Sequence, residues 1–207
     1  MSKLFLALAT SLVITSAAAL AQPTSAPASS SSATKVQAGT YKIDPDHTQV
    51  IWSVDHFGFS RLYGMVGGMS GTLRLDPARL DQAAVQVDIP LSGLTVTSPG
   101  FAKHLQTADL FDTAKFPTAR FVSRQVSARG QQATIAGDLT IKGVTKPIVL
   151  QARFHGAGAN PMNKAETVGF SATAKLKRSE FNLGYAVPAV SDEVQLEITA
   201  AFERQAG

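Results

Sequence analysis

The stretch GDLTIKGVTKPIVLQARF, residues 137–154, alternates apolar and polar side chains on both sides of a short turn. This period of two predicts paired strands with one apolar face and one polar face. The same alternation recurs in VIWSV, ATIAGDL, TVGFSATAKL and VQLEITAAF, at residues 50–54, 133–139, 167–176 and 194–202. A chain built from many such ribbons folds most economically as one barrel or sandwich.

Two further segments narrow the choice to a barrel. Glycines are dense over residues 58–71, where they favour the bulges and bends that curl a sheet. Residues 98–111 carry Phe101 and Leu105 at helical spacing, with Ser98 as a cap and Pro99 in the first turn. We therefore predict a mainly β fold, a single eight-stranded antiparallel β-barrel with a short helical insertion that lies over one end.

The N-terminal residues are expected to lie outside this barrel. A short basic start, an apolar run over residues 4–14 and Ala19-Leu20-Ala21 predict a cleaved secretory signal peptide at residues 1–21. The alternative, a retained anchor helix, would need about 20 apolar residues, and the run is shorter. Residues 22–39 are rich in Ala, Ser, Thr and Pro and predict a disordered leader, which leaves residues 40–204 as one domain.

Composition excludes several classes of site. The chain has no cysteine, so neither disulfides nor thiolate metal sites are expected. The formal charge of +4 is scattered along the sequence without a basic stripe, which argues against a nucleic-acid partner.

Catalytic motifs are equally hard to find. The four histidines, His47, His56, His104 and His155, show no metal-binding spacing, and we predict no metal site. No serine lies in a Gly-x-Ser-x-Gly elbow, the glycines of residues 64–71 lack the Lys-Ser/Thr ending of a phosphate loop, and the scattered carboxylates are typical of solvated loops. We therefore expect no catalytic residues and no enzyme.

What remains is the apolar face, for which two interpretations stay open: a filled core and a hollow lumen. The small residues Gly64, Gly137, Ala152, Ala172 and Ala174 share that face with large ones, which favours a lumen that is partly unfilled. Such a cavity would select a long hydrocarbon, because each buried methylene contributes about 0.8 kcal/mol.

Four ordered segments then indicate a family: residues 41–77, 104–123, 137–150, and 178–185 followed by 192–203. Together they resemble the YceI-like family of exported lipocalin-like proteins. His56, Gly58 and Phe59 match its His-x-Gly-Phe motif. A second motif of the family, His-Leu-x-x-x-Asp-Phe-Phe, is matched by His104, Leu105, Asp109, Leu110 and Phe111, with Leu110 in place of a phenylalanine.

The resemblance implies a lipocalin-like barrel in the periplasm that holds a long isoprenoid-type or quinone-like lipid, with a role in transport, storage or stress protection. No cofactor is required, but a bound polyisoprenoid or quinone-like lipid is expected. We expect Arg61, Lys103 or His104 to meet the polar head of the lipid. The predicted ligand-binding residues are Trp52, Val54, His56, Phe57, Val66, Leu73, Val87, Ile89, Phe101, His104, Leu105, Phe111, Phe121, Leu139, Phe154, Phe170 and Leu196.

Other hypotheses stay open at this point. An enzyme acting on an isoprenoid or quinone-type lipid would use His56 or His104 as general base. Besides the long-chain lipid, the expected partners are a second copy in a mouth-to-mouth homodimer, and a transient contact with the membrane or with a membrane redox protein.

Overall fold

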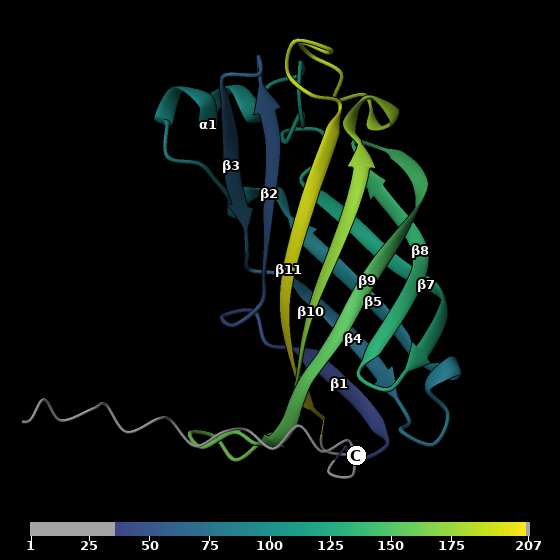
Figure 1. Ribbon diagram of the computed structural model, residues 1–207. Coiled ribbons are helices and arrows are strands. Elements are labelled where there is room, and N and C mark those ends of the chain that lie inside the picture. Colours follow the sequence, from purple (N-terminus) through teal and green to yellow (C-terminus); the bar gives the residue numbers. More distant parts are fainter. Residues whose placement is uncertain (1–35, 206–207) are drawn as a thin grey trace, which may run out of the picture.

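The computed structural model describes residues 36–205, so the predicted signal peptide at residues 1–21 and most of the predicted leader at residues 22–39 lie outside the described residues. All strands belong to one antiparallel sheet (Figure 1): β1 (Gly39–Ile43), β2 (Gln49–His56), β3 (Ser60–Val66), β4 (Ser70–Leu75), β5 (Ala84–Pro90), β6 (Leu94–Thr95), β7 (Thr118–Arg129), β8 (Gln132–Ile141), β9 (Val144–Ala159), β10 (Glu166–Lys177) and β11 (Glu193–Arg204). Strand β1 begins one residue before the predicted domain boundary.

Eight of these strands close into a ring, in the order β1-β4-β5-β7-β8-β9-β10-β11, and β11 pairs again with β1. The predicted eight-stranded antiparallel barrel is thereby confirmed. Two of the remaining strands, β2 and β3, arise because the first hairpin is interrupted in both arms. The turn at residues 44–48 separates β1 from β2, and residues 67–69 separate β3 from β4.

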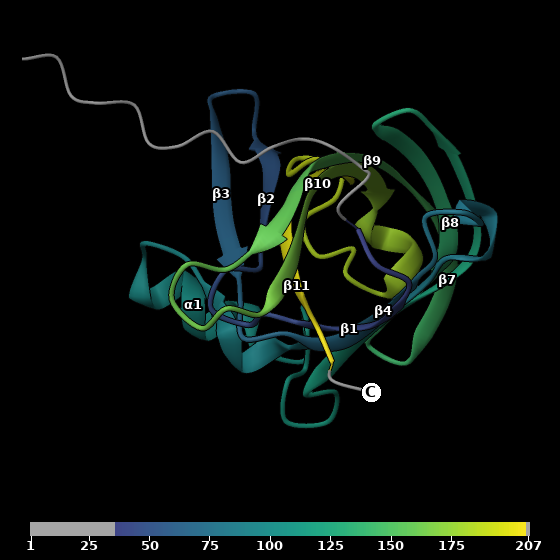
Figure 2. The same cartoon turned by 90° about the horizontal axis from the view of Figure 1, so that it is seen from below.

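Beyond these interruptions the hairpin β2–β3 separates from β5, the strand that pairs with β4 in the ring. Strand β2 still pairs with β11, but the outer edge of β3 pairs only with the two residues of β6. The helix α1 (Pro99–Leu105) lies beside this hairpin at the same end of the barrel (Figures 1 and 2). Its first turn is capped as predicted, because Ser98 Oγ accepts a hydrogen bond of 3.3 Å from the Phe101 N–H. Among residues 36–205, no helix is long and apolar enough to cross a membrane.

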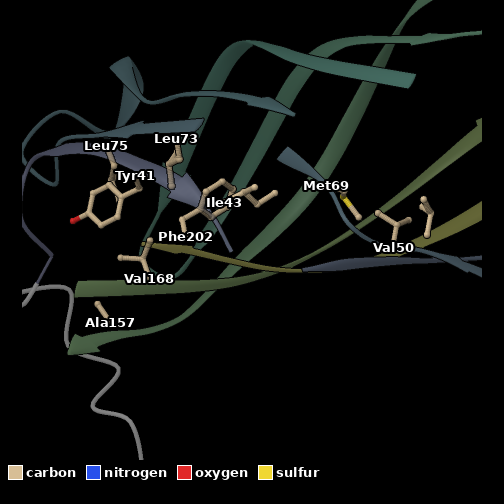
Figure 3. Close-up of a cluster of buried hydrophobic side chains, with 10 residues drawn as sticks. Tyr41, Ile43, Val50, Met69, Leu73, Leu75, Ala157, Val168 and Phe202 are labelled. Atoms are coloured by element: carbon tan, nitrogen blue, oxygen red, sulfur yellow. The ribbon is translucent and has the colours of Figure 1, made fainter. Parts of the chain in front are cut away.

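The opposite end of the barrel is sealed by packed side chains, which we call the basal cluster (Figure 3). Tyr41 and Val168 are fully buried at its centre. The Tyr41 hydroxyl donates a hydrogen bond of 2.6 Å to the Gln37 carbonyl and lies 3.2 Å from Glu166 Oε1. Burial and the Glu166 carboxylate raise the pKa of Tyr41 to about 12. The members of the cluster are Tyr41, Ile43, Val50, Val66, Met69, Leu73, Leu75, Ala157, Val168 and Phe202.

Candidate functional site: the barrel cavity

The interior of the barrel holds a cavity of about 760 Å³, which extends from the basal cluster towards the end of the barrel where α1 lies. This volume falls within the range of roughly 300–1,000 Å³ that is typical of small-molecule sites. The wall is almost entirely apolar, and among residues 36–205 no carboxylate lies on it. Its few polar side chains are Thr48, His56, Ser98, His104, Ser171, Arg178 and Tyr185.

The wall of the cavity contains nearly all of the residues that the sequence predicted as ligand-binding. Those on its wall are Trp52, Val54, His56, Phe57, Val66, Leu73, Val87, Ile89, Phe101, His104, Leu105, Phe111, Phe121, Leu139, Phe170 and Leu196. Phe154 is the one predicted ligand-binding residue that does not line the cavity among those that the structure describes. It packs against the basal cluster beside Phe170, with ring centroids 5.6 Å apart. The register of β9 and β10 shifts just after Phe154, between Gly169 and Phe170 on β10, so the alternation that directs Phe154 to the interior ends there.

The predicted small residues keep the lumen open in two different ways. Gly64 pairs across the hairpin with Trp52, and a Cβ at Gly64 would lie only 2.1 Å from Trp52 Cζ2. The indole therefore occupies the place of the missing side chain and lies against the wall. Gly137 accommodates the ring of Phe121 in the same manner, at 2.6 Å. These glycines thus do not leave empty space, as the sequence suggested, but let large rings withdraw from the lumen.

Two of the three predicted alanines leave space in the lumen, as the sequence suggested. Ala152 and Ala172 face each other across the β9–β10 pair, and both line the cavity directly. Ala174 is buried in a second apolar cluster, with Phe121 and Leu139. Short side chains at the first two positions leave room that larger residues would fill.

The mouth of the cavity is formed by aromatic and imidazole rings. The His56 ring lies 4.2 Å from that of Phe57, and the His104 ring lies 4.8 Å from that of Tyr185, both in edge-to-face contact. Phe101 of α1 contacts Trp52 edge-on at 6.4 Å. Polar atoms at the mouth can therefore meet the head of an amphiphile, while the apolar wall takes its tail.

Two of the three predicted head-group residues are not in the cavity. Arg61 lies outside it, where its Nη1 donates hydrogen bonds to Gln195 Oε1 at 2.9 Å and to Ser53 Oγ at 3.4 Å. Lys103 is exposed on α1 and does not line the cavity. Only His104 occupies the predicted position, because Arg61 and Lys103 are on the outward faces of their elements.

The loop over the mouth, residues 182–191, is organised by a residue that the sequence did not single out. Arg178, the residue directly after β10, is buried and donates hydrogen bonds to the carbonyls of Leu183, Tyr185, Val190 and Ser191. Burial lowers the pKa of Arg178, and the nearby Asp192 carboxylate opposes this shift. The motif RSEFNLGY contained both Arg178 and Tyr185, but nothing in its pattern indicated that one anchors the other.

A second cation ties this loop to the helical insertion. Lys142, in the turn between β8 and β9, donates hydrogen bonds to the Ala108 carbonyl at 2.7 Å and to the Asn182 carbonyl at 3.0 Å. The segment after α1 and the loop at residues 182–191 are therefore held together over the mouth.

The histidines offer little of the chemistry that a catalytic site needs. His104 Nε2 lies 3.7 Å from Asp109 Oδ2 at the mouth, whereas His47 pairs with Asp44 at 2.6 Å on the surface. His155 contacts Ser171 Oγ at 2.8 Å. Within the part of the chain that the structure describes, no three His, Asp or Glu residues gather as metal ligands would.

Known proteins resemble this chain in sequence and in architecture. Residues 41–202 match the YceI-like domain family. Protein YceI of Escherichia coli O157:H7 is 36% identical over 176 residues, which cover 84% of this chain and 92% of that protein. The crystal structure of BcnA from Burkholderia cenocepacia superposes with a TM-score of 0.69 at 25% identity, over 77% of this chain and 98% of BcnA.

A polyisoprenoid binding domain from Saccharophagus degradans shares the fold with a TM-score of 0.63 at 12% identity, over 80% of this chain and 98% of that domain. The family match spans nearly the whole barrel, from β1 to β11. The chain therefore belongs to the YceI-like family.

Proposed function

We propose that the protein binds a long-chain lipid of isoprenoid or quinone type in the barrel cavity and carries or stores it in the periplasm. The observation that carries this proposal is the cavity itself, about 760 Å³ in volume, apolar along its wall and sealed at the base by the basal cluster. Every methylene that moves from water into such a wall gains about 0.8 kcal/mol, so a long tail is favoured over a short one.

The polar atoms at the mouth give the bound lipid an orientation. His56, His104, Ser98 and the Tyr185 ring surround the open end, whereas the base is closed by apolar side chains. A head group that accepts hydrogen bonds is therefore held at the mouth, with the tail directed inward. The polyisoprenoid binding domain with the same fold is consistent with this class of ligand.

Native lipid content provides the first test. The protein is purified from the periplasm of its own host, extracted with organic solvent, and the extract is analysed by lipid mass spectrometry. We expect one long-chain lipid in near-stoichiometric amount. An extract free of lipid, from a protein that also takes up none on titration, would refute the proposal.

A pair of variants makes the titration specific to the lumen. Ala152 lines the cavity, while the next residue, Gln151, is exposed on the outer face of β9. Ala152→Phe should fill part of the lumen and weaken uptake of an isoprenoid quinone, whereas Gln151→Phe should leave uptake unchanged. Uptake can be followed by the fluorescence of Trp52, since this is the one tryptophan of the chain and it lies on the cavity wall.

The enzyme hypothesis is tested with the same probe. His104 Nε2 lies 3.7 Å from Asp109 Oδ2 at the mouth, beyond hydrogen-bond distance, so a general base at this position would act without a carboxylate that orients it. Conversion of the bound quinone by wild type but not by a His56→Gln, His104→Gln variant would favour an enzyme. The homodimer, a redox partner in the membrane and a role in stress remain predictions.

A further inference from the structure

Aromatic side chains are exposed around the mouth of the cavity. Phe59 is 90% exposed, Tyr185 is 53% exposed and Phe57 is 48% exposed. Phe57 and Phe59 belong to the turn between β2 and β3, and Tyr185 belongs to the loop between β10 and β11, at the same end of the barrel (Figure 1). We call these three residues the aromatic rim. Large apolar side chains that are exposed together at one end of a protein often mark a surface that binds another protein or a membrane.

The backbone holds the rim in this exposed position. Phe57 donates its N–H to the Ala189 carbonyl at 3.0 Å, which joins the turn to the loop over the mouth. Phe57 also adopts a left-handed backbone conformation with a φ of 60°, which is strained for a residue with a large side chain. The Gly58 N–H is bound by Asp55 Oδ1 at 2.7 Å. Tyr185 is fixed through its carbonyl by Arg178 and through its ring by His104.

We propose that the aromatic rim inserts into the interfacial region of a lipid bilayer and presents the cavity mouth to the membrane. The proposal rests on the proposed function for its cargo, because a water-insoluble lipid has to be collected from a membrane or delivered to one. Phe57 and Tyr185 connect the two sites directly, since both are exposed and both line the cavity. Aromatic rings are favoured at the membrane interface, where their apolar body is shielded from water.

The charges around the mouth fit a neutral membrane surface. Acidic and basic side chains balance over residues 55–61, 99–117, 142–143 and 178–192, so neither an anionic nor a cationic partner is favoured. The charged residues of these segments are Asp55, Arg61, Lys103, Asp109, Asp112, Lys115, Lys142, Arg178, Glu180 and Asp192. Binding should therefore depend on burial of the rings and change little with salt.

The size of the rim argues against a second copy as the occupant. If a whole aromatic side chain has roughly 200 Å² of surface, the rim exposes about 400 Å². A stable protein interface buries about 800 Å² on each partner. A bilayer needs no such area, because partial insertion of a few aromatic side chains already gives reversible attachment.

Vesicle flotation with a matched pair of variants tests the proposal. Phe59 and Met162 are equally exposed, at 90% and 89%, but Met162 is in the hairpin between β9 and β10 at the sealed end. The full chain is mixed with phosphatidylcholine vesicles at low and high salt. We expect Phe59→Ser to lower the partition coefficient on the order of tenfold, from the lost burial of one ring, and Met162→Ser to leave it unchanged.

Uptake of an isoprenoid quinone from a vesicle-free dispersion is measured on the same proteins through Trp52 fluorescence. Vesicle binding with no uptake would refute the proposed function and leave the docking surface in place. Normal uptake, with no flotation of wild type or with equal losses in both variants, would overturn the docking surface alone. A wild-type dimer in sedimentation that Phe59→Ser dissociates would also overturn it, because the rim would then contact a second copy.

Discussion

Gly64→Ala should narrow the lumen without adding a side chain to it. A Cβ at this position would lie 2.1 Å from Trp52 Cζ2 and 2.3 Å from Cε2, whereas ordinary van der Waals contact begins near 3.4 Å. The indole must therefore move by about 1.3 Å, and the backbone of the paired strand behind it directs that movement into the cavity. Room for roughly one or two methylene groups of ligand is lost.

The expected loss of affinity follows from that volume. At about 0.8 kcal/mol for each methylene, a lipid that fills the lumen should bind about 4-fold to 15-fold more weakly to the variant. A lipid too short to reach Trp52 should bind equally well to both proteins. The assay is a titration of Trp52 fluorescence with quinones that share one head group and differ in the length of the isoprenoid tail.

A matched control separates narrowing from the general effect of the substitution. Gly158, near the end of β9, would direct a new Cβ into open space, with no atom within 4 Å. Gly158→Ala should therefore leave the whole series unchanged. The reasoning is refuted if Gly64→Ala binds the longest quinone as tightly as wild type, or if it weakens short and long tails equally.

Two further predictions concern stability. Because the pKa of Tyr41 is raised from 10.0 to about 12, the folded protein keeps a phenol proton that the unfolded chain releases above pH 10, so stability should fall as the pH rises from 10 towards 12. Between pH 9 and pH 11, the free energy of unfolding of Tyr41→Phe, measured in urea, should fall by about 1 kcal/mol less than that of wild type. The exposed Tyr63→Phe is the control, and parallel pH profiles of wild type and Tyr41→Phe would contradict the prediction. Arg178→Met should cost about 2–4 kcal/mol of unfolding free energy, because carbonyls at the mouth lose their donor. The exposed Arg153→Met should cost little, and equal losses in the two variants would argue against the anchoring role of Arg178.

The sequence predicted the barrel and most of the cavity wall for one reason: alternation records which side of a strand is buried. Along β2 and β8, where the register is regular, the inner face is the predicted one. Phe154 follows the same alternation into the barrel interior, but it packs against the basal cluster and is not on the cavity wall, because spacing predicts the face of a strand and not the depth along the barrel.

The mouth was harder to predict than the wall. Arg178 and Tyr185 belong to a segment without periodicity, and their positions depend on carbonyl groups that only the folded loop brings together. Arg61 and Lys103 were expected near the head group because of their charge, yet charge says nothing about the face of an element on which a residue lies. Contacts between loops, such as Lys142 with Ala108 and Asn182, depend on tertiary structure alone.

The seal made by the basal cluster determines how cargo can pass through the molecule. Because the basal cluster fills one end of the barrel, a lipid that enters through the mouth with its tail first would leave by the same route with its head group first. The packed base argues against passage of a lipid straight through the barrel from one membrane to another. A carrier of this kind would instead have to diffuse between the two membranes and present the same mouth first to the donor and then to the acceptor.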